Sequence, residues 1–165
     1  MTIAVDFDGT IVEHKYPEIG KEIPYAIDTL KSLTADGHKI ILWTIREGQR
    51  LEEAVEFCRR KGLEFYAVNS DYPNASWSGK GVSRKLKADI YIDDRNVGGI
   101  PDWMTIHEMI TGHLDYNDIF DRMMESGDTR ELQVMDGAFR RRKRKKKGLL
   151  SRFFSRIKEA RIRYR

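Results

Sequence analysis

The sequence opens with Ile3-Ala4-Val5-Asp6-Phe7-Asp8-Gly9-Thr10, an apolar run that ends in two acidic residues. A short run of consecutive apolar residues is typical of a strand buried in a parallel sheet, so we predict a first strand over residues 3–7. This strand would deliver Asp6 and Asp8 to its carboxyl end. Two carboxylates this close repel each other unless a cation or proton lies between them, which favours a Mg²⁺ site. The alternative is an Asx-type turn with Gly9 at its bend.

Strands and helices alternate along the rest of the chain. The predicted helices cover residues 24–36, 49–61 and 104–124, and the predicted strands cover residues 39–43, 65–68 and 90–92. The pair Thr111-Gly112 is expected to divide the last helix in two. This alternation is typical of an α/β fold in which right-handed crossovers connect the strands of a parallel sheet flanked by helices.

Polar residues follow three of the four predicted strands. Asp6 ends the first strand, Thr44 follows the second, and Asp93-Asp94 follows the last. In open α/β sheets, ligands bind beyond the carboxyl ends of the strands. These residues are therefore expected to form a site at one edge of the sheet.

Four ordered motifs resemble those of the haloacid dehalogenase (HAD) superfamily. They are the Asp6-Phe7-Asp8-Gly9-Thr10 motif, Thr44, Lys85 and the Ile92-Asp93-Asp94-Arg95 motif, and the resemblance covers roughly residues 1–103. It implies a HAD-like Rossmannoid α/β fold. It also implies an Mg²⁺-dependent phosphomonoester hydrolase that works through an aspartyl-phosphate intermediate.

The resemblance also implies a catalytic role for four residues. Asp6 matches the nucleophile of the family, and Asp8 matches the general acid/base. Thr44 matches the hydroxyl that hydrogen-bonds the transferring phosphoryl group, and Lys85 matches the cation that steadies nucleophile and phosphate. An aspartate two positions after the nucleophile indicates phosphoester chemistry rather than attack on a carbon–halogen bond.

The same resemblance implies a metal site and a phosphate-binding loop. Asp94, with Asp93 beside it, matches the acidic metal-binding motif, to which Asp6 and the backbone carbonyl of Asp8 would contribute. Carboxylate and carbonyl oxygens are the ligands that Mg²⁺ prefers. Gly9 and Thr10 would lie in the loop that binds the phosphate.

Several other residues have two interpretations each. Lys80 is the alternative to Lys85, because a proline commonly follows the lysine in the family and Leu86 stands there instead. Arg46 either reaches an anionic substrate or forms a surface pair with Glu47. Asn69, at the end of the third predicted strand, either contacts substrate or caps the following loop. Trp77 in that loop is either an exposed aromatic or a stacking surface for a base or sugar.

The spacing of the motifs leaves no room for a cap domain. Only 33 residues separate Thr10 from Thr44, and a short flap, one helix and one strand account for them. One helix, one strand and one loop likewise account for the residues between Thr44 and Lys85. We therefore predict a minimal or absent cap and an open site.

Charge divides the chain into two parts. Residues 140–165 hold 14 Lys and Arg and one acid, a net charge of +13, whereas residues 1–139 hold 16 basic and 25 acidic residues, a net charge of −9. We predict a HAD-like phosphatase domain over residues 1–139. Residues 140–165 would form a tail, with a polybasic run of eight cations followed by a basic amphipathic helix.

The tail has three candidate partners. A polybasic run beside an amphipathic helix suits an anionic membrane surface, and eight cations also suit nucleic acid. The apolar face of the helix could instead dock onto the protein itself or onto a second copy. The N-terminus has no secretory signal pattern and there is a single cysteine, Cys58, so we expect a cytoplasmic protein, peripheral at the membrane if the tail binds there.

Three functions therefore remain open. The first is a phosphatase acting on a phosphorylated small molecule or a nucleotide. The second is a polynucleotide end phosphatase, which the open site, the basic tail and a similarity of residues 92–95 to the phosphatase halves of end-healing enzymes favour. The third is a non-catalytic adaptor that recruits partners through its tail, and the filled catalytic positions count against it.

Overall fold

The computed structural model of the protein describes residues 1–73 and 85–126. The sequence-based predictions for Trp77, Lys80 and the tail at residues 140–165 lie outside the described residues. The proposed HAD-like domain is therefore described over most, though not all, of its predicted length.

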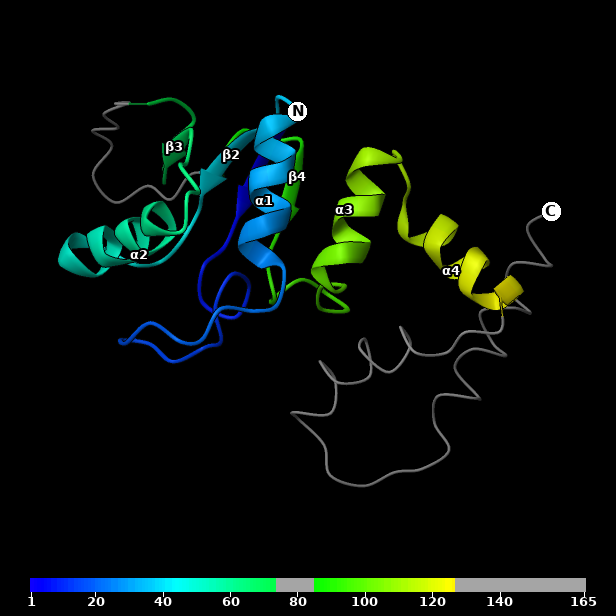
Figure 1. Ribbon diagram of the computed structural model, residues 1–165, viewed down its shortest axis with the longest axis horizontal. Coiled ribbons are helices and arrows are strands. Elements are labelled where there is room, and N and C mark those ends of the chain that lie inside the picture. The colour runs from blue at the N-terminus through cyan, green and yellow to red at the C-terminus, as the bar shows by residue number, and fades with distance from the viewer. Residues whose placement is uncertain (74–84, 127–165) are drawn as a thin grey trace, which may run out of the picture.

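A four-stranded parallel sheet forms the centre of the fold (Figure 1). Its strands are β1 (Thr2–Val5), β2 (Lys39–Leu42), β3 (Ala67–Val68) and β4 (Ile90–Ile92), in the order β3-β2-β1-β4. In the register, Val5 lies opposite both Leu42 and Ile92. The three strands thus end at one level, and the residues that follow them meet at one edge of the sheet. The predicted α/β fold with a parallel sheet is confirmed.

Four helices accompany the sheet within residues 1–73 and 85–126. They are α1 (Ala26–Ala35), α2 (Gly48–Arg60), α3 (Trp103–Thr111) and α4 (Tyr116–Ser126). Gly37 has a φ of 85°, a left-handed conformation that ends α1 where the sequence predicts. The predicted division of the last helix is confirmed, since α3 ends at Thr111. Within the described part of the chain, no helix has the length and apolar character needed to cross a bilayer.

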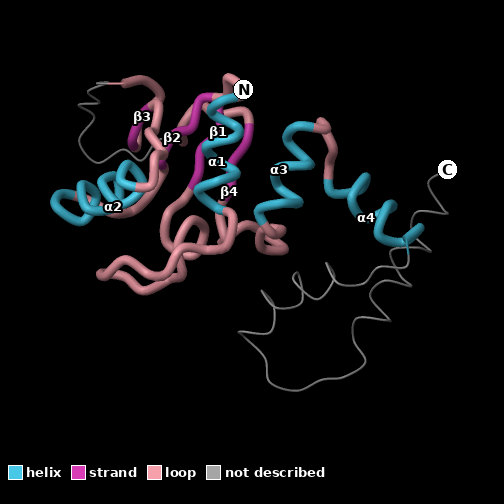
Figure 2. The backbone as a smooth tube through the Cα atoms, viewed as in Figure 1, coloured by secondary structure: helices cyan, strands magenta, loops and turns pink. Residues whose placement is uncertain are grey.

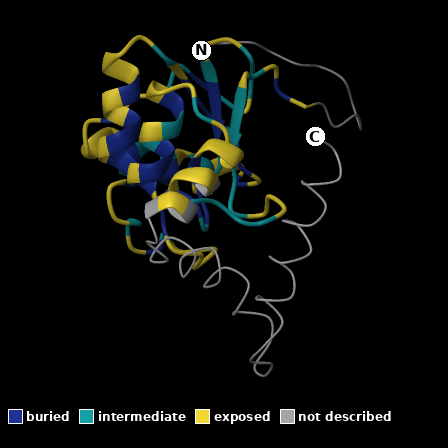
Figure 3. Cartoon of the chain, turned by 90° about the vertical axis from the view of Figure 1, so that its right-hand side faces the viewer, coloured by how far each residue is buried: buried dark blue, intermediate teal, exposed yellow. Residues whose placement is uncertain are grey.

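The main hydrophobic core lies between one face of the sheet and helices α1, α2 and α3. Figure 3 shows the buried residues gathered on this side of the molecule. The buried residues of the main core include Ile3, Val5, Leu30, Leu33, Ile40, Leu42, Cys58, Ile92, Trp103 and Ile106. Alternate residues of each strand point to this face, as the two-residue period of a strand requires. The site at the carboxyl edge is therefore next to a well-packed core.

The opposite face of the sheet carries a smaller core. Ala4, Ile41, Ala67 and Leu86 are its buried members, and partly buried aromatic residues pack against them. The rings of Trp43 and Tyr91 meet there edge to face, with centroids 5.4 Å apart. Because Trp43 directly precedes Thr44, this aromatic pair extends to the edge where the strands end.

Candidate active site

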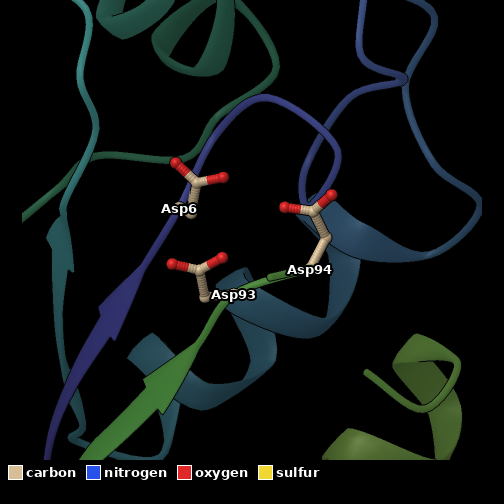
Figure 4. Close-up of side chains that lie close together, drawn as sticks. All are labelled: Asp6, Asp93 and Asp94. Atoms are coloured by element: carbon tan, nitrogen blue, oxygen red, sulfur yellow. The ribbon is translucent and has the colours of Figure 1, made fainter. Parts of the chain in front are cut away.

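Three carboxylates meet at the carboxyl edge of the sheet (Figure 4). Asp6 follows β1, and Asp93 and Asp94 follow β4. One oxygen from each lies within 4.8 Å of the others. Hard oxygen ligands converging at this spacing fit a divalent cation such as Mg²⁺. The parallel pairing of β1 with β4 brings together residues that are almost ninety positions apart in the sequence.

The acidic neighbours change the ionisation of Asp6. Burial, together with the charges of Asp93, Asp94 and Asp8, raises the pKa of Asp6 to about 7, although a backbone hydrogen bond from Phe7 lowers it. Like charges at short range disfavour the ionised form, and a bound cation reverses that effect. The charges at this edge of the sheet therefore favour the binding of a cation.

Thr10 connects the two halves of the acidic cluster. Its hydroxyl donates to Asp6 Oδ2 over 3.4 Å and accepts from the backbone N–H of Asp94 over 3.0 Å. The backbone carbonyl of Thr10 accepts from the buried indole N–H of Trp103 over 3.1 Å. Thr10 is fully buried. The predicted contact between Thr10 and the phosphate is therefore not what the geometry supports, because Thr10 positions the carboxylates instead.

Gly9 leaves the space that Asp94 occupies. It has a φ of 97°, and a Cβ added there would lie 2.5 Å from Asp94 Oδ2. The turn therefore needs a glycine for its backbone conformation and for the close approach of the carboxylate.

We predict that Gly9→Ala weakens Mg²⁺ binding by about 10- to 100-fold, because the new methyl group displaces Asp94 from the cluster. Titration with Mg²⁺ or Mn²⁺ measures the affinity. Gly37→Ala is the matched control, since Gly37 also has a positive φ, 85°, and has nothing within 4 Å of an added Cβ. Equal losses in the two variants would attribute the effect to backbone strain alone.

Asp8 forms a buried ion pair with Arg46. The Arg46 Nε donates to Asp8 Oδ2 over 2.6 Å and its Nη2 donates to Asp8 Oδ1 over 2.7 Å, a bidentate pair. The side chains are 0% and 6% exposed. This hydrogen bonding raises the pKa of Arg46, so the guanidinium stays charged. Such a pair fixes both the position and the direction of the Asp8 carboxylate.

Arg46 also holds a flap, which we define as residues 11–23. The flap is a hairpin-like excursion in which Glu13 N–H donates to the carbonyl of Lys21, and Figure 2 shows it among the loops below the sheet. Arg46 Nη1 donates to the carbonyl of Pro17 over 3.0 Å and Nη2 to that of Glu18 over 2.9 Å. The guanidinium lies 5.2 Å from the ring centroids of both Phe7 and Tyr16.

These contacts correct both interpretations of Arg46. It is completely buried, so it forms no surface pair with Glu47. Its guanidinium is taken up by Asp8 and the flap, so contact with an anionic substrate would require breaking a buried ion pair. The sequence could not distinguish these arrangements, because Asp8 lies 38 residues away.

Thr44 and Asn69 lie next to each other at the ends of β2 and β3. The Asn69 Oδ1 accepts from the backbone N–H of Thr44 over 2.8 Å, and the Thr44 hydroxyl accepts from the backbone N–H of Arg46 over 3.2 Å. The Thr44 hydroxyl retains its proton for donation. Asn69 thus holds the β2 end in place, which favours neither direct contact with substrate nor capping of its own loop.

A small pocket opens beside the carboxylates. It has a volume of about 160 Å³ and is lined by Asp6, Asp8, Trp43, Thr44, Ile45, Asp93 and Arg95. Sites for drug-sized ligands have volumes of about 300–1,000 Å³, so this pocket suits a phosphoryl-sized group while the rest of a substrate extends outward. The stretch from Thr10 to Thr44 holds only the flap, α1 and β2, as expected for an open site.

Lys85 does not line this pocket. Its Nζ lies 4.4 Å from the centroid of the Tyr91 ring, on the face of the sheet that carries the smaller core. The structure therefore does not bring Lys85 to the nucleophile as the resemblance implied. Leu86, next to Lys85, is buried, which anchors the backbone at this point.

Sequence reasoning missed four residues of the site. Trp43, Ile45 and Arg95 line the pocket, and Trp103 supports Thr10 from behind. Arg95 stands in the Ile92-Asp93-Asp94-Arg95 motif without an assigned role, and Trp43 directly precedes Thr44, so these positions were the available signal. Trp103 had no local signal, because only the packing of α3 against α1 brings its indole to the motif loop.

The fold and the site define an α/β protein with an acidic cluster and a small pocket at the carboxyl edge of a parallel sheet. A solved structure, described as the conserved protein coded by a locus from Bacteroides thetaiotaomicron, is similar to it, with 62% sequence identity and a TM-score of 0.67. The alignment covers 73% of this chain and 97% of that chain. This chain therefore belongs to the same family as that conserved protein. No protein-family model matches the chain, and the search of curated proteins returned no match.

Proposed function

We propose that the protein is an Mg²⁺-dependent phosphomonoester hydrolase that works through an aspartyl-phosphate on Asp6. The observation that carries the proposal is the convergence of Asp6, Asp93 and Asp94 within 4.8 Å beside a phosphoryl-sized pocket. The motif resemblance supports it, because all three residues occupy positions that the HAD superfamily uses. Phosphoryl transfer depends mainly on positioning and charge neutralisation, for which such a site is suited.

The first step would transfer the phosphoryl group to Asp6. One carboxylate oxygen of Asp6 attacks phosphorus, and the bond between phosphorus and the ester oxygen breaks, with the electron pair going to that oxygen. The leaving oxygen takes a proton from the carboxylic acid of Asp8 and departs as an alcohol. Thr44, whose hydroxyl retains a proton, would donate to a phosphoryl oxygen.

The second step would release inorganic phosphate. A water oxygen attacks phosphorus, Asp8 takes a proton from that water, and the bond between phosphorus and Asp6 breaks. Asp6 returns as a carboxylate and Asp8 as an acid, so the cycle closes. Both Asp8 oxygens accept hydrogen bonds from Arg46 in the structure, so Asp8 can carry this proton only after its side chain leaves Arg46 and turns toward the pocket, which breaks the buried ion pair.

Mg²⁺ fits the residues at this edge. Asp6, Asp93 and Asp94 would hold it, and the Asp8 backbone carbonyl is the further ligand that the resemblance implies. When bound, the ion would neutralise charge on the phosphoryl group and screen the carboxylates from it. Without such charge the acidic cluster repels a phosphate dianion.

The substrate class that we propose is a small phosphomonoester or a nucleotide. Only the phosphoryl group needs to enter the pocket, and the leaving group can extend past Trp43 and Ile45, of which Ile45 is 71% exposed. The same openness favours the second candidate, a polynucleotide end phosphatase, whose substrate is too large for an enclosed site.

We predict that phosphate release requires Mg²⁺ and is lost in excess chelator, because Asp6, Asp93 and Asp94 then face the substrate without compensating charge. The measurement is phosphate release from p-nitrophenyl phosphate, nucleoside monophosphates and 3′- or 5′-phosphorylated oligonucleotides, each with and without Mg²⁺. Full turnover in chelator rules out the proposed chemistry. Preference for the oligonucleotides over the small esters favours the second candidate.

A further inference from the structure

One basic side chain of the pocket, Arg95, has no role assigned by the motif resemblance or by the proposed mechanism. Among the described residues that line the pocket, Arg95 is the only Lys or Arg. Its backbone N–H donates to Asp93 Oδ1 over 2.8 Å, which fixes the turn after β4. The side chain is exposed, so a ligand can reach it. Arg95 therefore projects from the same turn that supplies two of the three carboxylates.

The other described cations near the site have different contacts. The Arg46 guanidinium is fully buried and bound to Asp8, Pro17 and Glu18. The Lys85 ammonium lies over the Tyr91 ring on one face of the sheet, outside the pocket lining. Each would have to break its present contacts to reach a phosphoryl group at Asp6. Arg95 would not.

A phosphoryl group in this pocket needs more positive charge than a divalent ion supplies. The lining residues Asp6, Asp8 and Asp93 are acidic, and Asp94 adjoins them. The planar guanidinium fork matches two phosphoryl oxygens, and its charge is insensitive to pH in the physiological range. A cation fixed beside the transferring group stabilises the charge that spreads over its oxygens.

We infer that Arg95 is a catalytic residue that binds the phosphoryl oxygens of the substrate, in the role that the motif resemblance assigns to Lys85. The inference rests on the proposed function and adds to it a named phosphate-binding residue. It also limits the substrate: the transferred group must be an anion with at least two oxygens facing the Asp93-Asp94-Arg95 turn. The requirement concerns the transferred group alone, so the leaving group of the substrate can be charged or uncharged.

The test compares single-charge removals in the full-length protein. Arg95→Gln, Lys85→Gln and the control Lys39→Gln each remove one positive charge from an exposed side chain, and Lys39 lies at the opposite end of β2, over Tyr66. Hydrolysis of p-nitrophenyl phosphate at saturating Mg²⁺ gives kcat and KM. We expect Arg95→Gln to lower kcat/KM by about 100-fold or more. The reduction in kcat/KM caused by Lys85→Gln should be smaller than that by a factor of at least about ten. Lys39→Gln should match the parent.

A conservative variant and a binding measurement complete the test. Arg95→Lys should recover part of the loss, because it restores the charge without the fork. The affinity of inorganic phosphate in the presence of Mg²⁺, measured by calorimetry, should fall in Arg95→Gln and change less in Lys85→Gln. If Lys85→Gln loses more kcat/KM or more phosphate affinity than Arg95→Gln, the inference is overturned.

The outcomes separate this inference from the proposed function. If the parent hydrolyses phosphomonoesters and Arg95→Gln does so equally well, the inference fails and the function stands. If the parent has no turnover on any phosphomonoester, the proposed function fails. The affinity for inorganic phosphate then tests whether Arg95 binds phosphoryl oxygens. Equal phosphate affinity in the parent and Arg95→Gln, or no phosphate binding by the parent, then overturns the inference as well.

Discussion

Asp6→Asn is expected to abolish phosphate release and, at the same time, to make the protein more stable than the parent at pH 8 in excess chelator. The amide cannot attack phosphorus, and loss of a nucleophile lowers turnover by about a thousandfold or more. The gain in stability follows from the pKa of Asp6, which is raised from 3.8 to about 7. The folded state therefore holds the Asp6 proton more tightly than the unfolded state.

The sign follows from linkage. Between pH 3.8 and about 7 the unfolded chain loses the Asp6 proton while the folded protein retains it, so the parent loses stability as pH rises through this range. Asparagine is close in shape and carries no charge, so the variant escapes that loss. Urea unfolding at pH 5 and pH 8 measures the effect, and the difference between variant and parent should be larger at pH 8.

Asp28→Asn is the matched control, because Asp28 is exposed on α1 and its ion-pair partner among the described residues is Lys31 at 3.8 Å. It should leave turnover unchanged and lower the free energy of unfolding by less than about 1 kcal/mol, since Asp28 lies in the first turn of α1. Turnover of Asp6→Asn within tenfold of the parent would refute the nucleophile assignment. A variant that is inactive and less stable than the parent at pH 8 would attribute the inactivity to damage of the fold.

Arg46→Gln is expected to lower the free energy of unfolding by about 3–5 kcal/mol, because it leaves the Asp8 carboxylate buried without its partner. The variant also loses the hydrogen bonds to the carbonyls of Pro17 and Glu18. A loss of this size is a large fraction of the stability of an ordinary domain. Thermal and urea unfolding measure it.

Two comparisons make this prediction specific. Arg50→Gln removes a guanidinium that pairs with Glu53 over 2.9 Å on the exposed side of α2, and it should cost less than about 1 kcal/mol. Hydrogen exchange should increase in the flap, residues 11–23, in Arg46→Gln and remain unchanged in Arg50→Gln. Equal stability of the two variants would contradict a structural role for Arg46.

The order of strands and helices could be predicted because it depends on local patterns. The apolar run that includes Ile3 and Val5 is short, continuous and followed by acids, and the structure places it in the centre of the sheet. The approach of Asp6 to Asp93 and Asp94 follows from the same pattern, since parallel strands in register end together. To expect these three carboxylates at one edge, it was enough to locate the strands and to recognise that they run parallel.

The roles of the basic residues could not be predicted in this way. A long, flexible side chain at the end of a strand can point toward a ligand, into the protein or along the sheet, and its own neighbours in the sequence do not decide among these directions. Arg46 turns inward because Asp8 and two flap carbonyls, between 28 and 38 residues away, form a site for its guanidinium. Lys85 lies over Tyr91 because Leu86 is buried in the smaller core.

The amino-acid sequence alone was therefore sufficient for the fold class and for the acidic cluster, because backbone hydrogen bonding and burial of apolar residues act on every strand in the same way. Tertiary packing decided which arginine is structural and which lines the pocket. It also made Thr10 a link between carboxylates, since the indole of Trp103 reaches its carbonyl only when α3 packs against α1. The physical reason is range: a strand is defined by its own residues, whereas a buried charge is stable only where distant segments together supply its partners.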